Sequence, residues 1–223
     1  MVPLILLPGM GGDARMFRPQ LAAFANARVP SWIDPQPGES LGSYAARMAR
    51  AVDPGEACLI GGASFGGMVA VEMSRYLPRA PACFLIGSIR SPRELPPRIR
   101  VSRFWLKKAT VGVPYLVPGV ARGLRLLIPP RVAVATRSML QQLADCDRRF
   151  FRWAALAVLG WEEPAEPPRV PVLQIHGTRD HILPCRYTRP DVLVRGAGHL
   201  LSMTHAQEVN AFLRDGLDKY RSS

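Results

Sequence analysis

Short runs of consecutive apolar residues recur along the chain, and a glycine or another turn-forming residue closes each of them. Six such runs predict strands, at residues 3–7, 28–33, 57–60, 82–86, 170–175 and 191–194. The runs lack the apolar-polar alternation of a half-exposed strand. They therefore predict strands buried on both faces, as in a parallel sheet.

Segments with apolar residues at helical spacing lie between most of these runs. Residues 18–25 and 41–51 predict amphipathic helices, and residues 68–77 predict a strong helix that Pro78 ends. The alternation of strand and helix predicts an α/β fold, with a mostly parallel sheet of about six strands and right-handed crossovers between them.

The alternation stops between Ser88 and Pro168. These roughly 80 residues are too many for a loop within a compact sheet, so the segment must have structure of its own. Residues 98–108 and 138–159 predict helices, and proline-rich joints such as Pro96-Pro97, Pro118 and Pro129-Pro130 punctuate the segment. The pattern predicts a core made of residues 1–87 and 169–223, with residues 88–168 inserted in the same domain as a helical cap.

The composition is that of one ordinary globular domain. A chain of 223 residues can bury a core without disulfides or metals, and its 48% hydrophobic and 21% charged residues are close to globular averages. No run approaches the roughly 20 apolar residues of a transmembrane helix. The four cysteines at 58, 83, 146 and 185 lack the spacing of a zinc or redox site. We expect a cytoplasmic protein with reduced cysteines, no metal and no transmembrane segment.

The net charge of +12 is concentrated in one part of the sequence. Residues 88–169 hold 15 basic and 6 acidic residues, which is +9 of the total. Such a surface suits an acidic acyl-carrier protein, an anionic substrate head group or a membrane surface, although arginine-rich codon usage explains it equally well. No nucleic-acid partner is expected, because no nucleic-acid-binding motif is present.

The strongest chemical signal is Gly62-Ala-Ser64-Phe-Gly66, which joins a predicted strand to a predicted helix. This is the Gly-x-Ser-x-Gly pattern of a nucleophile elbow. The sharp turn at such a serine leaves room only for very small residues two positions before and after it. The N-terminus of the following helix also favours an anion at the reaction centre. The pattern predicts Ser64 as a nucleophile, with an incidental serine in a glycine-rich turn as the alternative.

A nucleophilic serine needs a base, and the chain has four histidines. His199 lies in a loop of small residues after the last predicted strand, where its imidazole can reach over the carboxyl edge of the sheet. His176 ends a buried strand, His181 follows the candidate acid, and His205 falls inside the predicted closing helix. The position predicts His199 as the base, with an ordinary loop histidine as the alternative.

The candidate acid is Asp180, in the loop after the strand predicted at 170–175. Open α/β sheets place their sites at this carboxyl edge. The alternatives are a turn-forming role for Asp180, Glu94 after an earlier strand, and Asp191, which begins a strand at the opposite edge. The chain order Ser, Asp, His favours Asp180.

A glycine-rich loop, Pro8-Gly-Met10-Gly-Gly12, follows the first predicted strand. Such a loop can turn a backbone N–H toward the oxygen of a tetrahedral intermediate. We predict the N–H groups of Met10 and Phe65 as the oxyanion donors. A dinucleotide-binding loop is the alternative, but the Gly-x-Gly-x-x-Gly spacing is incomplete, so no cofactor is expected.

Together these segments resemble the α/β-hydrolase superfamily over nearly the whole chain, and the inserted segment resembles the cap of its small esterases and thioesterases. The resemblance implies a catalytic triad of Ser64, Asp180 and His199, an oxyanion hole at Met10 and Phe65, and a pocket between sheet and cap. Two departures are Pro8-Gly9, where His-Gly is common, and the 18 residues that separate Asp180 from His199.

The resemblance implies a serine hydrolase that cleaves a carboxylic ester or thioester through an acyl-enzyme. Aromatic residues in the predicted cap favour an apolar acyl group, although aromatic residues at helical spacing also build cores. The candidate pocket walls are Phe104, Trp105, Phe150, Phe151, Trp153 and Trp161. A cofactor-free haloperoxidase or lyase would use the same triad, and a non-catalytic ligand-binding relative would keep only the fold.

Overall fold

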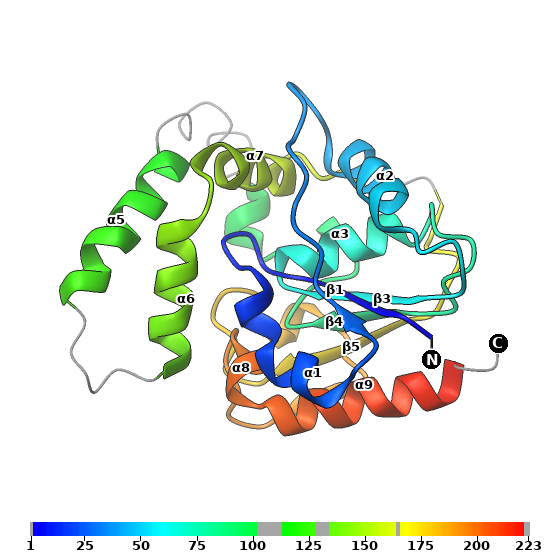
Figure 1. The fold of residues 1–223 in the computed structure, drawn as a ribbon. Coiled ribbons are helices and arrows are strands. Elements are labelled where there is room, and N and C mark those ends of the chain that lie inside the picture. The colour runs from blue at the N-terminus through cyan, green and yellow to red at the C-terminus, as the bar shows by residue number, and fades with distance from the viewer. Residues whose placement is uncertain (1, 102–112, 128–133, 164–165, 221–223) are drawn as a thin grey trace.

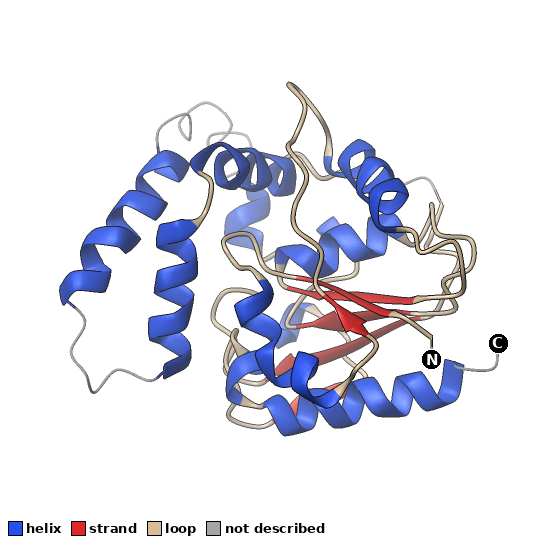
Figure 2. Cartoon of the chain, in the orientation of Figure 1, coloured by secondary structure: helices blue, strands red, loops and turns tan. Residues whose placement is uncertain are grey.

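One sheet of six parallel strands organises the chain (Figures 1 and 2). The computed structural model describes residues 2–101, 113–127, 134–163 and 166–220. The strand order is β2-β1-β3-β4-β5-β6. The strands are β1 (Leu4–Leu7), β2 (Ala27–Arg28), β3 (Leu59–Ala63), β4 (Cys83–Ile86), β5 (Val172–Gly177) and β6 (Val192–Val194). The predicted α/β fold with a six-stranded parallel sheet is confirmed.

The strands are apolar throughout because both faces of the sheet are covered. Successive side chains of β1 enter different cores: Leu4 and Leu6 pack on one face, and Ile5 and Leu7 pack on the other. Helices α2 (Leu41–Val52) and α3 (Phe65–Met73) cover one face. Helices α1 (Arg18–Ala23), α8 (Leu201–Thr204) and α9 (Ala206–Tyr220) cover the other (Figure 1).

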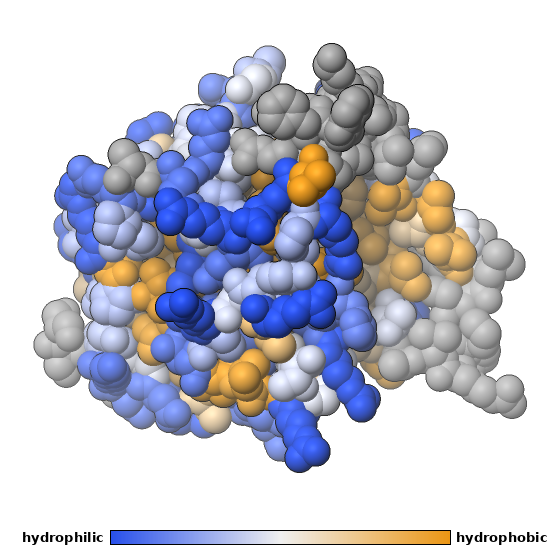
Figure 3. All heavy atoms as spheres, turned by 180° about the vertical axis from the view of Figure 1, so that it is seen from behind, coloured by the Kyte–Doolittle hydropathy of each residue, from blue (hydrophilic) through white to orange (hydrophobic). Residues whose placement is uncertain are grey.

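The described parts of the 88–168 segment are mainly helical. It contains α5 (Val113–Leu127), α6 (Val134–Asp145) and α7 (Arg148–Leu159). Helices α5 and α6 form a pair beside the carboxyl ends of the strands, while α7 packs above α3 (Figure 1). Apolar side chains gather at the surface on the α5–α6 side of the molecule (Figure 3), where Val120, Leu124 and Val134 are exposed.

Several predicted boundaries were wrong. The strand predicted at 28–33 ends at Arg28, because Pro30 cannot donate a hydrogen bond to a neighbouring strand. The helix predicted at 138–159 is two helices, since the Asp147 side chain accepts hydrogen bonds from the N–H groups of Arg149 and Phe150 and so begins α7. Pro118 lies inside α5 and is not a joint between helices.

Two further boundaries differ from the predictions. The helix predicted at 68–77 begins at Phe65 and ends at Met73. The predicted closing helix is interrupted at His205, which separates α8 from α9. Of the helix predicted at 98–108, the described residues 98–101 are helical. Three short 3₁₀ helices complete the fold: η1 (Ala14–Phe17), η2 (Pro92–Glu94) and η3 (Cys185–Tyr187). Within the described residues, no helix has both the length and the apolar character needed to cross a bilayer.

Candidate active site

Ser64 lies on a sharp turn between β3 and α3. Its φ of 51° and ψ of −121° make it the one non-glycine residue with positive φ in the described part of the chain. A Cβ atom added to Gly62 would overlap the backbone of Gly66, and one added to Gly66 would overlap the carbonyls of Leu7 and Pro8. The turn therefore requires glycine at both positions. Helix α3 begins at the next residue, so its positive end lies at the serine.

The structure brings Ser64, His199 and Asp180 into one hydrogen-bonded chain. His199 Nε2 lies 2.8 Å from Ser64 Oγ, and His199 Nδ1 lies 2.7 Å from Asp180 Oδ2. The two loops that follow β5 and β6 carry Asp180 and His199 to the carboxyl edge of the sheet. The His199 side chain is 17% exposed and Ser64 is half-buried, so a substrate can reach both. The arrangement suits proton transfer from a serine to a histidine.

The Asp180 side chain is 0% exposed, and both of its carboxylate oxygens have hydrogen-bond partners. Its Oδ1 accepts from the N–H groups of Ile182 and Leu183, each at 2.8 Å, and its Oδ2 faces His199 and His176. Burial alone would raise the pKa of Asp180, but the hydrogen bonds from His176 and His199 outweigh it. The pKa of Asp180 is therefore held well below its usual range, and the carboxylate stays ionised.

The alternative acids and bases have other partners. Glu94 accepts a hydrogen bond from the N–H of Arg90 at 2.8 Å; burial raises the pKa of Glu94, and that hydrogen bond offsets part of the rise. Asp191 pairs with the Arg90 guanidinium at 2.8 Å. His205 lies at the break between α8 and α9, and His181 is exposed. The geometry thus favours Asp180 and His199 over these residues.

The glycine-rich loop lies directly beside the serine. A Cβ atom added to Gly9 would lie 3.6 Å from Ser64 Cβ. The N–H of Gly9 donates to Met16 Sδ at 3.3 Å, and this hydrogen bond joins the loop to η1. Neither the Met10 N–H nor the Phe65 N–H donates a hydrogen bond to another described residue. Both donors therefore remain available for an oxyanion.

A sequence profile identifies the family of the chain. The sequence profile described as the alpha/beta hydrolase family matches residues 4–212. The chain belongs to the alpha/beta hydrolase family. No curated protein matches the chain.

Solved structures share the fold of this alpha/beta hydrolase at low sequence identity. A thermophilic esterase from Thermogutta terrifontis, with malate bound, is 20% identical, with a TM-score of 0.71 over 99% of this chain and 90% of its own. The enol-lactonase from Burkholderia xenovorans LB400 is 20% identical, with a TM-score of 0.71 over 98% and 92%. A hydrolase from Pseudomonas aeruginosa PA01 is 19% identical, with a TM-score of 0.73 over 97% and 90%.

The aromatic residues predicted as pocket walls fall into different environments. Phe104 and Trp105 lie outside the described residues. Trp161 is 3% exposed and donates its Nε1–H to Glu72 at 2.8 Å, so it belongs to the core. Phe151 is half-buried, and its Cε2 lies 3.5 Å from the position of a Cβ atom on Gly11. Phe151 is thus beside the glycine-rich loop.

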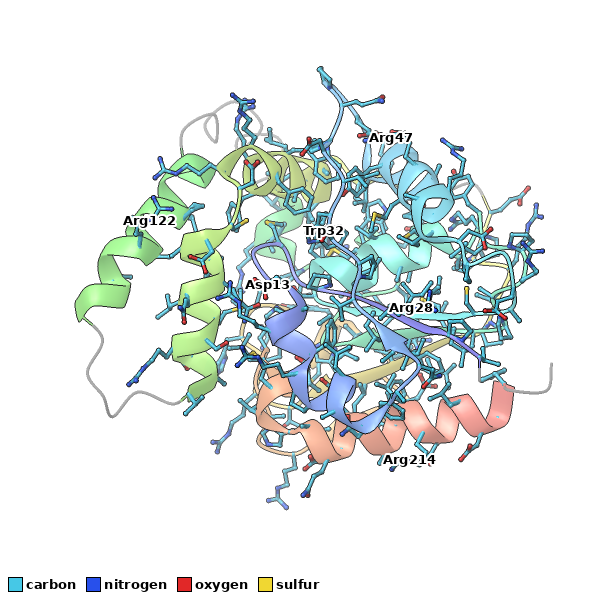
Figure 4. The ribbon with its side chains drawn as sticks, in the orientation of Figure 1. Asp13, Arg28, Trp32, Arg47, Arg122 and Arg214 are labelled. Carbon is cyan, nitrogen blue, oxygen red and sulfur yellow. The ribbon has the colours of Figure 1, made fainter. Side chains whose placement is uncertain are left out.

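Phe150 and Trp153 belong to a cluster of packed rings around the residue after the nucleophile. The members of this aromatic cluster are Trp32, Tyr44, Phe65, Phe150 and Trp153. Trp32 lies between α7 and α3 (Figure 4), stacked on Phe150 at 5.2 Å and tilted against Phe65 at 5.5 Å between ring centroids. The cluster joins the 88–168 segment to the nucleophile elbow.

The contacts that α6 makes with the glycine-rich loop and with Asp13 were not predicted from the sequence. The N–H of Asp13, which lies near α6 in Figure 4, donates to Gln142 Oε1 at 2.9 Å, and Leu143 is the nearest side chain to Gly11. Gln142, Gly11 and Phe150 line a cavity of about 200 Å³ beside the loop. A larger cavity of about 560 Å³ lies between residues 35–40 and α7, and no candidate triad residue lines it. Since Asp13 and Gln142 are 129 positions apart in the sequence, no local spacing could have indicated their contact.

Proposed function

We propose that this chain is a serine hydrolase that cleaves a carboxylic ester or thioester with an apolar acyl group, using Ser64, His199 and Asp180. One observation carries the proposal: the hydrogen bonds run without a break from Ser64 Oγ through the His199 ring to Asp180 Oδ2. The strained elbow at Ser64 and the free N–H groups beside it support the same chemistry.

The reaction would proceed in two halves. Ser64 Oγ attacks the carbonyl carbon while His199 Nε2 takes the serine proton, and the N–H groups of Met10 and Phe65 stabilise the tetrahedral oxygen. His199 then gives the proton to the leaving oxygen or sulfur, and the acyl group stays on Ser64. In the second half, His199 takes a proton from water as the water attacks the acyl-enzyme, and it returns that proton to Ser64 Oγ as the acyl–oxygen bond breaks and the acid leaves. Asp180 remains ionised throughout and stabilises the imidazolium.

The side chains beside the oxyanion loop favour an apolar acyl group. Leu143 and Phe151 are the side chains that a Cβ atom on Gly11 would meet, and the aromatic cluster packs around Phe65. Lactones fall within the proposal because they are cyclic esters, and one structural neighbour is an enol-lactonase. Because apolar walls exclude water from the site, the polar interactions that stabilise the oxyanion become stronger.

We assign the 88–168 segment the role of a cap over this site. The hydrogen bond from the Asp13 N–H to Gln142 supports this role, because it joins α6 to the loop that carries Met10. The ion pair of Arg15 with Asp145, at 2.9 Å, adds a second link. A cap attached in this way would shape the acyl pocket while leaving the triad on the sheet.

The test combines active-site labelling with substrate profiling. We expect a fluorophosphonate to label Ser64, and a chain-length series of nitrophenyl esters and acyl thioesters to be hydrolysed. Ser64→Ala should lose the labelling and roughly a millionfold in kcat while keeping the fold. Ser31→Ala, at an exposed loop serine, is the matched control. A folded Ser64→Ala protein with near-normal turnover would overturn the proposal. Peroxide-dependent halogenation without ester hydrolysis would favour the haloperoxidase alternative.

A further inference from the structure

A second chain of buried polar contacts lies behind the candidate triad and runs from Ser64 to Asp180. Ser88 Oγ donates to the carbonyl of Ser64 at 2.6 Å, and Gln174 Nε2 donates to the carbonyl of Ser88 at 2.6 Å. Gln174 Nε2 also lies 3.4 Å from His176 Nδ1, and His176 Nε2 lies 3.3 Å from Asp180 Oδ2. Ser88, Gln174 and His176 are each 0% exposed, so their polar atoms depend on one another.

Arg90 fixes the direction of the Gln174 amide. A guanidinium can only donate, and Arg90 Nη1 lies 2.6 Å from Gln174 Oε1. The amide oxygen therefore faces Arg90, and the amide NH₂ faces the Ser88 carbonyl and His176. Because an NH₂ group can only donate, Nδ1 of His176 must be the acceptor.

The carbonyl of Leu183 fixes the same tautomer from the other side of the ring. It lies 2.6 Å from His176 Nε2, and a carbonyl can only accept, so Nε2 carries the proton. With Nδ1 accepting and Nε2 donating, the His176 ring is neutral. The same Nε2–H faces Asp180 Oδ2.

We propose that His176 is a positioning residue for the catalytic acid, a role that rests on the proposed function. Asp180 Oδ1 is occupied by the N–H groups of Ile182 and Leu183, which leaves Oδ2 for the two histidines. His199 Nδ1 lies 2.7 Å from Oδ2, and the His176 Nε2–H, which the Leu183 carbonyl accepts at 2.6 Å, also faces Oδ2 at 3.3 Å. The His176 ring thereby fills the space behind Oδ2 and presents its polar hydrogen there, which holds the carboxylate in the orientation that His199 requires. Since the chain also ends on the Ser64 carbonyl, the acid and the nucleophile share one buried polar frame.

The tautomer can be tested without measuring activity. In full-length protein labelled with ¹⁵N-histidine, we expect the signals that disappear in His176→Gln to be those of a neutral imidazole with its proton on Nε2. Gln174→Glu has nearly the same shape but presents an acceptor to the ring, so Nδ1 of His176 should gain a proton. A proton on Nδ1 in the unmodified protein, or an unchanged tautomer in a folded Gln174→Glu protein, would overturn the inference. This result holds or fails whether or not Ser64 is the nucleophile.

Kinetics test the effect on Asp180. We expect His176→Phe to lower kcat about tenfold with little change in KM, because a positioned donor to a charged group is lost. His176→Gln, which can keep an N–H near the position of Nε2, should recover most of that loss, and His205→Gln is the matched control. Equal kcat values for folded His176→Phe and the unmodified protein, or no difference between the Phe and Gln variants, would contradict a positioning role. If the unmodified protein neither hydrolyses esters nor reacts with a fluorophosphonate, the proposed function itself fails.

Discussion

The carboxyl edge of the sheet and the 88–168 segment meet at the candidate site, but they contribute different kinds of contact. At the edge, Asp180 and His199 are each held by directional hydrogen bonds between buried or half-buried groups. The segment contacts the same place mainly through apolar side chains, such as Leu143 beside Gly11. Hydrogen bonds weaken steeply with misalignment, whereas apolar contacts tolerate exchange for groups of similar volume.

This difference leads us to infer a division of labour. The sheet would fix the reaction, and the segment would choose the acyl group. A change at the edge should therefore alter turnover for every substrate, while a change in the segment should alter the ranking of substrates. The predictions below test that separation, beginning with the largest effect.

Asp180→Asn should reduce kcat by about 10⁴ for all esters in a chain-length series, because an amide favours the wrong tautomer of His199. Steady-state kinetics on short and long nitrophenyl esters checks this. Glu94→Gln is the matched control and should leave kcat within a few-fold of the unmodified protein, since Glu94 bonds to Arg90. A large loss in Glu94→Gln with a small one in Asp180→Asn would reverse the assignment of the acid.

Adjacent phenylalanines on α7 allow a sharper test of the segment. Phe150 is 6% exposed within the aromatic cluster, so Phe150→Ala should lower the free energy of unfolding by about 3–5 kcal/mol. Phe151 is half-buried beside Gly11, so Phe151→Ala should cost little stability. It should instead change the ratio of kcat/KM between long-chain and short-chain esters by roughly tenfold. Urea unfolding and the ester series separate the two effects. Unchanged chain-length preference in Phe151→Ala would remove this residue from the pocket.

The same division explains which features could be predicted from the sequence. The sheet followed from continuous apolar runs, because burial on both faces leaves a local pattern, and only β2 was much shorter than its run. The glycines on either side of Ser64 predicted its sharp turn, and the loops after the strands predicted that Asp180 and His199 lie at the carboxyl edge. Each of these features is local in the sequence.

The remaining features depend on contacts between distant segments. Trp32 was not recognised as a partner of Phe150, and Gln142 was not recognised as a partner of the glycine-rich loop. His176 was interpreted only as a residue at the end of a buried strand. Its tautomer depends on Gln174, whose amide is oriented by Arg90, 84 residues earlier. No spacing rule connects such residues before the chain is folded.

The polar edge of the sheet should also respond to acid. Because the folded pKa of Asp180 lies below its unfolded value, ionised Asp180 stabilises the fold above about pH 4, and this contribution is lost as the pH falls further. Asp180→Asn lacks it. The difference in unfolding free energy between the two proteins should shrink by about 1–2 kcal/mol as the pH falls from about 5 to near 3. Asp215→Asn, at an exposed carboxylate, is the control. A difference that stays constant down to pH 3 would contradict this contribution.

The smallest expected effect concerns the charge of the segment, where Arg90 and Arg93 are already paired with Asp191 and Glu163. Exposed arginines at 100, 148 and 149 remain candidates for attracting an anionic substrate. If they do so, kcat/KM for an anionic ester should fall severalfold between low salt and 0.2 M salt, because exposed charges are screened over about 10 Å at 0.1 M. A neutral ester should hardly respond. Reversing these three arginines to glutamate should remove the salt dependence for the anionic ester alone.

The matched control reverses three exposed arginines outside the segment, Arg28, Arg50 and Arg214, and so changes the net charge by the same amount. Long-range attraction by the whole protein would be weakened equally in both triple variants, whereas a local effect of the segment would be lost only in the first. Equal salt dependence for the anionic and neutral esters in the unmodified protein would mean that the basic residues of the segment are an ordinary solvated surface. In that case the segment would select substrates through its apolar contacts alone, and the contrast with the polar edge of the sheet would be complete.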